Sequence, residues 1–136
     1  MRVLRGLSSP VTVPTALAIG NFDGVHRGHV ALLERLVGVA KDLHLVPAVL
    51  TFEPHPREFF APASAPARLT ILREKLELIA ASGVEMTIVC AFNAHFAALS
   101  ADEFIGWVLQ RGLQVRHLIV GDDFRFGQGR RGDFAL

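Results

Sequence analysis

The chain of 136 residues has little of several features that assign a sequence to a particular class of protein. Its single cysteine, Cys90, cannot form an internal disulfide, so a reducing, cytoplasmic setting is expected. It lacks an apolar run of about 20 residues, the length that a membrane-spanning helix needs. Its 14 Lys and Arg against 13 Asp and Glu give a net charge of +1, so no partner nucleic acid or acidic membrane is expected. An anionic ligand would therefore need a local site.

Two kinds of sequence motif are also missing. The start of the chain lacks the continuous apolar segment of a secretory signal, because Pro10, Thr12, Pro14 and Thr15 interrupt it. The chain contains neither G-x-G-x-x-G nor G-x-x-x-x-G-K-[ST], which disfavours dinucleotide oxidoreductases and P-loop hydrolases. With 51% hydrophobic residues, the chain is nevertheless long enough for one globular domain with a substantial core.

The chain does contain short apolar runs that alternate with amphipathic helical stretches. The predicted strands span 15–20, 44–52, 86–91 and 115–121, and the predicted helices span 27–41, 70–82 and 100–112. This alternation is typical of an α/β fold, a Rossmann-like open parallel sheet with helices on both faces. The segment 53–67 is rich in proline and is expected to be a loop.

Local signals refine the helices. Ser100 and Glu103 have capping-box spacing, and the helix 70–82 is expected to start at an N-cap Thr70 and to stop at Gly83. Cys90 is expected to be a buried core thiol. The residues expected on buried helix faces are Val30, Leu33, Leu36, Val37 and Ala40 in the first helix and Leu72, Leu76 and Ile79 in the second.

The most informative segment is "GNFDGVHRGH" at 20–29, directly after the first strand. A glycine-rich turn entering a helix offers free backbone N–H groups and the positive end of the helix dipole, which suit a phosphate. His26 and His29 lie three residues apart, so both imidazoles would share nearly one helix face, and Gly28 would let the backbone approach closely. This arrangement suits displacement at phosphorus, in which the protein positions reactants and stabilises charge.

Other unusual segments follow the remaining strands: "EPHP", "FNAHF" and "GDDFRFGQGRRG". Because carboxyl ends of parallel strands meet at one sheet edge, all of these segments point to one site. Plainer interpretations stay open. The two histidines could simply cap a helix, "EPHP" could be a rigid surface turn, and His26, His29 and His55 could bind zinc, although no ligating carboxylate or cysteine pair accompanies them.

"GNFDGVHRGH" resembles the H-x-G-H signature of the nucleotidylyltransferase superfamily. Together with "TFEPHPREFF", "FNAHFAALSADEFI" and "VGDDFRFGQGRRGD", it makes the chain similar to the adenylyltransferase (FAD synthetase) module of bacterial bifunctional riboflavin kinase/FAD synthetases. The resemblance implies a nucleotidylyltransferase-type fold and transfer of AMP from ATP, bound with Mg²⁺, to FMN, giving FAD and pyrophosphate. The FMN phosphate would be the nucleophile, and no metal site built from the protein's own residues is expected.

The resemblance also implies roles for individual residues. His26 and His29 would be catalytic. The ATP site would comprise Gly20, Asn21, Phe22, Asp23, Gly24, His26, Gly28 and His29, and the flavin site Pro54, Pro56, Phe60, Asp123 and Phe126.

The similar module continues beyond the segment "GDFAL" into an S-S-T-x-x-R type motif and then a riboflavin kinase domain. Residues 1–136 are therefore expected to form an FMN adenylyltransferase-like domain that is incomplete at its C-terminus and carries no kinase domain. Two alternatives stay open: a nucleotidylyltransferase with another acceptor, and a fragment that binds nucleotide or flavin without turnover.

Overall fold

A computed structural model describes residues 1–6, 11–20, 22, 27–53, 72–91, 98, 100–104, 106 and 114–120. Its strands are β1 (Arg2–Arg5), β2 (Thr15–Ile19), β3 (Val46–Glu53), β4 (Met86–Ala91) and β5 (Val115–Val120). Its helices are α1 (Arg27–Leu43), α3 (Leu72–Ala81) and α5 (Ala101–Glu103). Each predicted strand is confirmed within a few residues at its ends.

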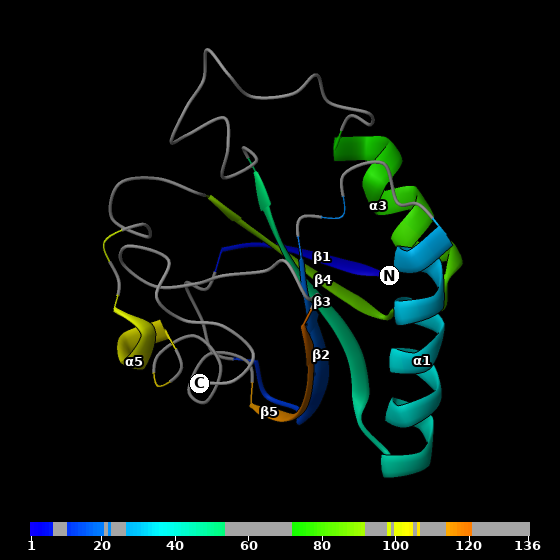
Figure 1. The fold of residues 1–136 in the computed structure, drawn as a ribbon, viewed down its shortest axis with the longest axis horizontal. Helices are drawn as coiled ribbons and strands as arrows, with labels where there is room; N and C mark the ends of the chain where they lie inside the picture. Colours follow the sequence, from blue (N-terminus) through cyan, green and yellow to red (C-terminus); the bar gives the residue numbers. More distant parts are fainter. Residues whose placement is uncertain are drawn as a thin grey trace.

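The strands form one parallel sheet in the order β1-β4-β3-β2-β5 (Figure 1). The predicted parallel α/β architecture is therefore confirmed. Strand β1 was not predicted. It is a short edge strand whose only partly buried residue is Leu4, and its charged ends give it little of the apolar pattern of a strand.

The strand order contains a topological switch at β2. The chain runs from β2 to β3 to β4 in one direction across the sheet, and then returns to place β5 on the other side of β2. In open parallel sheets, ligands bind outside the carboxyl ends of the strands at such a point. The end of β2, where Gly20 follows Ile19, is therefore the place in the fold best suited to a ligand.

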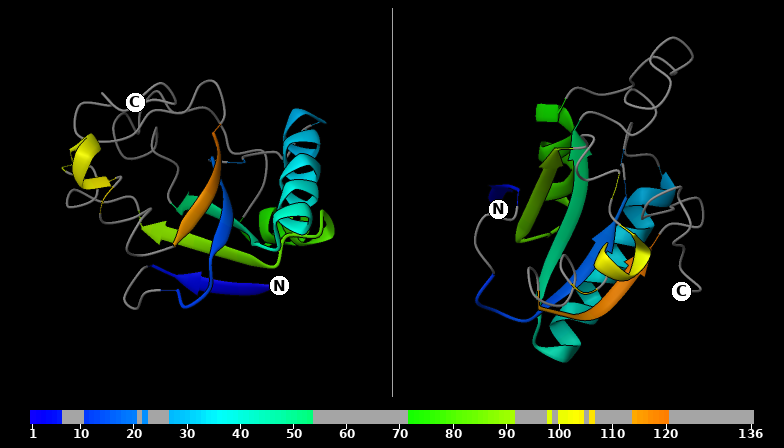
Figure 2. Two further views of the ribbon diagram at one scale, coloured as in Figure 1. Left: turned by 90° about the horizontal axis from the view of Figure 1, so that it is seen from below. Right: turned by 90° about the vertical axis from the view of Figure 1, so that its left-hand side faces the viewer.

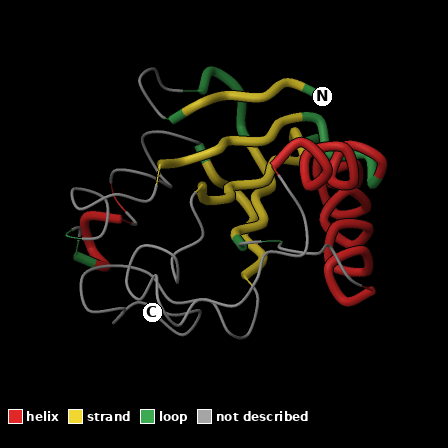
Figure 3. Tube along the Cα trace, turned by 90° about the horizontal axis from the view of Figure 1, so that it is seen from above, coloured by secondary structure: helices red, strands yellow, loops and turns green. Residues whose placement is uncertain are grey.

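Helices lie on both faces of the sheet, as predicted. Helices α1 and α3 lie side by side on one face, called here the α1/α3 face, and α5 lies on the other, the α5 face (Figure 2; Figure 3). Side chains alternate between the faces along each strand. The α1/α3 face buries Ala16, Ala18, Phe22, Leu33, Leu36, Ala40, Val49, Ile79 and Val84. The α5 face buries Val11, Leu17, Ile19, Ala48, Leu50, Phe52, Met86, Ile88, Cys90 and Phe104.

The buried stripe of α1 differs from the predicted one at its start. Leu33, Leu36 and Ala40 are fully buried, as expected, but Val30 is 38% exposed. The stripe continues backwards from Leu33 by one helical turn to His29, which is half-buried. The prediction that Val30 is buried was wrong because His29 takes that place on the helix face.

The local signals at helix ends are largely confirmed where the structure describes them. The Glu103 amide donates to Ser100 Oγ at 3.1 Å, and the Ser100 amide donates to Glu103 Oε1 at 3.1 Å, which completes the capping box. Helix α3 is followed by Gly83 in a left-handed conformation with φ +95°, as its role as a stop signal requires. Thr70, predicted as an N-cap, lies outside the described residues.

None of the helices in the described part of the chain combines the length and apolar character needed to cross a membrane.

Candidate functional site

The turn after β2 folds back over its own glycine. Phe22 adopts a left-handed backbone conformation with φ 53°, which is uncommon for a bulky residue, and its ring is buried at 2% exposure. The ring lies so close to Gly20 that a Cβ there would be 2.9 Å from Phe22 Cε2. The Gly20 amide donates to the Leu50 carbonyl at 3.2 Å, so the turn is also tied to β3. Gly20 is needed here because a side chain would displace the Phe22 ring.

Phe22 joins this turn to the start of α1. Its ring meets the His29 imidazole edge-on, with ring centroids 5.2 Å apart and an interplanar angle of 63°. His29 is half-buried and its Nδ1 atom is buried. Because the Phe22 side chain packs in the core, its predicted contribution to an ATP site can come only from its backbone. The ring instead restricts the orientation of His29.

The first turn of α1 provides an environment suited to an anion. It contains no acidic residue, although Asp and Glu are the residues that a helix dipole favours there. Gly28 is exposed and His29 follows it, so backbone and imidazole lie together at the positive end of a 17-residue helix. This helix end follows the turn at the carboxyl end of β2, where the strand order switches. The geometry fits a phosphate group.

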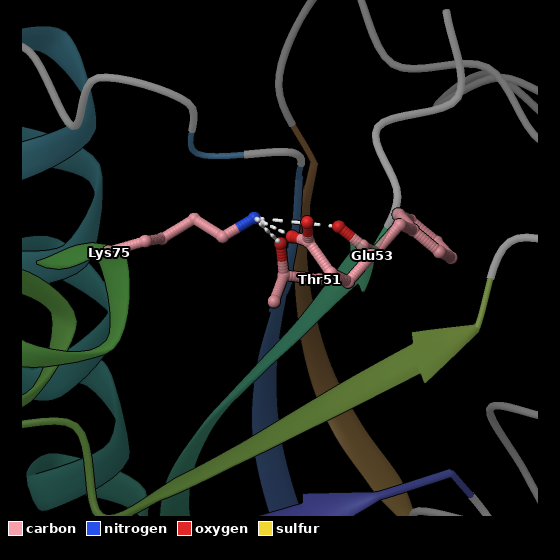
Figure 4. A network of polar contacts seen from close by, with 4 residues as sticks. Thr51, Glu53 and Lys75 are labelled. Atoms are coloured by element: carbon pink, nitrogen blue, oxygen red, sulfur yellow. Dashed lines mark hydrogen bonds and ion pairs between the residues drawn. The ribbon is translucent and has the colours of Figure 1, made fainter. Parts of the chain in front are cut away.

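Lys75 was not among the predicted site residues, but it is buried at the same edge of the sheet (Figure 4). Its Nζ donates to Thr51 Oγ1 at 3.1 Å and to the Phe52 carbonyl at 3.5 Å, and lies 3.8 Å from Glu53 Oε2. The predicted apolar positions of α3, Leu72, Leu76 and Ile79, already place Lys75 on the inward face, three residues after Leu72. That spacing was the signal available in the sequence.

The remaining predicted site residues lie outside the described residues. For the ATP site these are Asn21, Asp23, Gly24 and His26, and for the flavin site Pro54, Pro56, Phe60, Asp123 and Phe126. The shared helix face of His26 and His29 therefore stays a prediction, as does the alternative of zinc bound by His26, His29 and His55. Within the ranges that the structure does describe, no group of three His, Cys, Asp or Glu side chains could hold a metal ion.

Cys90 is the core thiol that the sequence predicted. It is 5% exposed on the α5 face, and burial raises its pKa from the ordinary 9.0 to about 11. A thiol that resists ionisation in this way is a poor nucleophile at neutral pH. Cys90 therefore serves packing.

Known proteins resemble this chain in sequence and in fold. The family described as FAD synthetase matches residues 9–136. The protein of Escherichia coli (strain K12) that is named bifunctional riboflavin kinase/FMN adenylyltransferase is 50% identical to this chain. The match covers 100% of this chain and 44% of that relative. The one from Pseudomonas fluorescens is 48% identical, over 98% of this chain and 43% of the relative. The chain thus spans less than half the length of these relatives.

A solved structure shares the fold. It is described as a macrolide-efflux protein from Streptococcus pneumoniae, and it superposes with a TM-score of 0.78 over 93% of this chain and 44% of its own. At 23% identity this likeness concerns the fold alone. The sequence match, by contrast, extends over nearly all of the chain. The predicted resemblance is therefore confirmed: the chain belongs to the FAD synthetase family.

Proposed function

We propose that this chain binds ATP and FMN and acts in the transfer of AMP from ATP to FMN. The names of its bifunctional relatives include this activity, FMN adenylyltransferase. The observation that carries the proposal is the first turn of α1. It brings His29 and an exposed Gly28 to the carboxyl end of the central strand β2, beside the Gly20 turn, in a member of the FAD synthetase family.

In the proposed reaction an oxygen of the FMN phosphate forms a bond to the α-phosphorus of ATP. The bond from that phosphorus to the bridging oxygen of the β-phosphate breaks, and its electron pair leaves with pyrophosphate. The FMN phosphate is already anionic at neutral pH, so no general base is needed. ATP enters as its Mg²⁺ complex, in which the ion offsets charge on the triphosphate.

The protein's part in this reaction is to position the two substrates and to stabilise charge. His29, and His26 with it, would donate hydrogen bonds to the phosphates, since a polyphosphate nearby favours the protonated imidazole over the neutral form. The α1 dipole acts in the same direction. Asn21, Asp23 and Gly24 complete the proposed nucleotide site. Pro54, Pro56, Phe60, Asp123 and Phe126 form the proposed flavin site.

Two further parts of the proposal concern the protein's setting. The relatives named for two activities pair FMN adenylyltransferase with riboflavin kinase, and we propose that this chain acts next to such a kinase domain. A cytoplasmic setting is proposed as well, supported by the buried and reduced Cys90.

The proposal is tested by titrating the chain with FMN and with ATP plus Mg²⁺, followed by chromatography of the same sample for FAD. Binding of both ligands with FAD formed supports adenylyl transfer by residues 1–136. Binding of both without FAD favours the alternative in which the chain binds nucleotide and flavin without turnover. Binding of ATP but not of FMN favours another acceptor. Binding of neither would overturn the proposal.

A further inference from the structure

A buried ammonium group distinguishes α3 from the other described helices. The chain has two lysines: Lys41, exposed in the last turn of α1, and Lys75, which is 2% exposed on the inward face of α3. Removing a charged group from water costs free energy unless other groups solvate it, so a buried lysine must have polar partners. Those partners show what the charge holds together.

All the partners of the Lys75 ammonium given above belong to the last three residues of β3: the Thr51 hydroxyl, the Phe52 carbonyl and the Glu53 carboxylate (Figure 4). Thr51 is fully buried, and the Glu53 side chain is 22% exposed. The interaction therefore fixes the carboxyl end of β3 to α3. We call Lys75, Thr51, Phe52 and Glu53 the β3 anchor.

The β3 anchor adjoins the turn after β2. Leu50, which directly precedes Thr51, accepts the hydrogen bond from the Gly20 amide and pairs in register with Ile19. One turn along α3 from Lys75, Ile79 packs in the same apolar cluster as Phe22. Thus the strand that Lys75 holds in place supports the turn whose phenylalanine restricts His29.

We propose that Lys75 is a positioning residue for the nucleotide site: through Thr51 and the end of β3 it fixes the Gly20 turn and, through Phe22, the His29 imidazole. The inference rests on the proposed function. The ammonium acts on the site through β3 and needs no contact with substrate. Positioning of this kind matters because displacing a reacting group by about 1 Å can cost about a hundredfold in rate.

The test compares variants that remove the interaction with variants that keep it or remove a charge elsewhere. Lys75→Met removes the ammonium and keeps an unbranched apolar side chain. Thr51→Val removes one acceptor oxygen without changing the size of the side chain, and Thr51→Ser keeps that oxygen. Arg73→Met is the matched control, because Arg73 lies two residues away on α3, is 84% exposed and pairs with Glu77 on the surface.

Binding of ATP plus Mg²⁺ to each variant is measured by calorimetry at a temperature where circular dichroism shows that variant fully folded. We expect Lys75→Met to raise the Kd for ATP about tenfold or more, Thr51→Val to raise it less, and Thr51→Ser and Arg73→Met to leave it unchanged. Loss of a merely structural contact would lower the unfolding temperature without changing the Kd of the folded protein.

Folded Lys75→Met that binds ATP with the Kd of the wild type overturns the inference, and Thr51→Val decides in the same way if Lys75→Met does not fold. Failure of the wild-type chain to bind ATP is a different result, because it overturns the proposed function itself and this inference with it.

Discussion

The two faces of the sheet are built from the same strands but differ in chemistry. On the α5 face the described residues bury an apolar cluster that includes the unreactive Cys90. They also bury Thr15 fully, which lies on the same face as Leu17 and Ile19 because side chains alternate along β2. The α1/α3 face buries an apolar cluster as well, but at the carboxyl edge it adds the ammonium of Lys75, the hydroxyl of Thr51 and the contact between Phe22 and His29. Among the described residues, the polar and ring contacts at the carboxyl edge therefore lie on the α1/α3 face, where packing is coupled to the candidate site.

The largest expected effect on stability belongs to the α5 face. Ile88 is fully buried in β4, and Ile88→Ala removes packed atoms and leaves a cavity. We expect a loss of about 2–5 kcal/mol in the free energy of unfolding, measured by urea denaturation, and a smaller loss of about 1 kcal/mol for Ile88→Val. The folded variants should bind ATP and FMN as the wild type does. Weakened binding by fully folded Ile88→Val would show that the two faces are not separable in this way.

At the carboxyl edge of the α1/α3 face we expect a substitution to lower the rate of the reaction. His29→Ala should lower the rate of FAD formation about a hundredfold or more, since it removes a proposed donor to charge that develops in the transition state. The control is His44→Asn, at an exposed position after α1 with φ 56°, where Asn tolerates the left-handed backbone. An unchanged rate in His29→Ala would remove this imidazole from the mechanism.

The contrast between the faces also explains what the sequence could predict. Short apolar runs predicted the central strands β2, β3 and β4, because strands of a parallel sheet that are covered on both faces are buried on both sides. A similar run predicted β5, which lies at the edge of the sheet. Helical apolar spacing failed at Val30, where the half-buried His29 takes the inward position instead, and although it placed Lys75 on the inward face of α3, this lysine was not predicted to be buried. Residue type alone assigns a histidine or a lysine to the surface, whereas here a ring contact and hydrogen bonds at the sheet edge decide the placement of His29 and Lys75.

The glycine-rich motif could not predict the buried contacts of Phe22 either. Glycine-rich spacing predicted a ligand turn, and its described residues Gly20 and Phe22 follow β2, where the strand order switches. The motif alone carried no information on which side chain would fold inward. That depends on the close approach of the Phe22 ring to Gly20 and on its left-handed backbone.

Because Cys90 is buried on the α5 face, the free energy of unfolding should depend on pH in the alkaline range. The thiol has a pKa of about 11 in the folded chain against the ordinary 9.0, because burial disfavours the thiolate. Below pH 9.0 both states hold the proton. Between pH 9.0 and about 11 the unfolded chain loses it first, so the free energy of unfolding should fall by up to about 3 kcal/mol.

The measurement is urea denaturation at several pH values for the wild type and for Cys90→Ala. The variant should lack the part of the decline that the thiol causes, whatever its stability at pH 7. Identical slopes for the two proteins between pH 9 and 11 would contradict the assignment of Cys90 as a desolvated thiol.

The smallest expected effect is that of Gly20→Ala, which tests how tightly the turn after β2 is packed. Gly20→Ala places a Cβ 2.9 Å from the Phe22 ring, which is buried and has little room to move, so we expect a loss of about 1–3 kcal/mol in the free energy of unfolding. Gly38→Ala is the matched control: it lies inside α1 with no atom within 4 Å of the added Cβ, and should stabilise the chain by about 1 kcal/mol.

Adding Phe22→Leu to Gly20→Ala should make the combined loss smaller than the sum of the two single losses, because the shorter side chain removes the clash. Strictly additive losses would mean that Gly20 does not accommodate the Phe22 ring, and the restriction on His29 would then need another source. A non-additive result, accompanied by weaker ATP binding in folded Gly20→Ala, would tie the packing of the α1/α3 face directly to the nucleotide site.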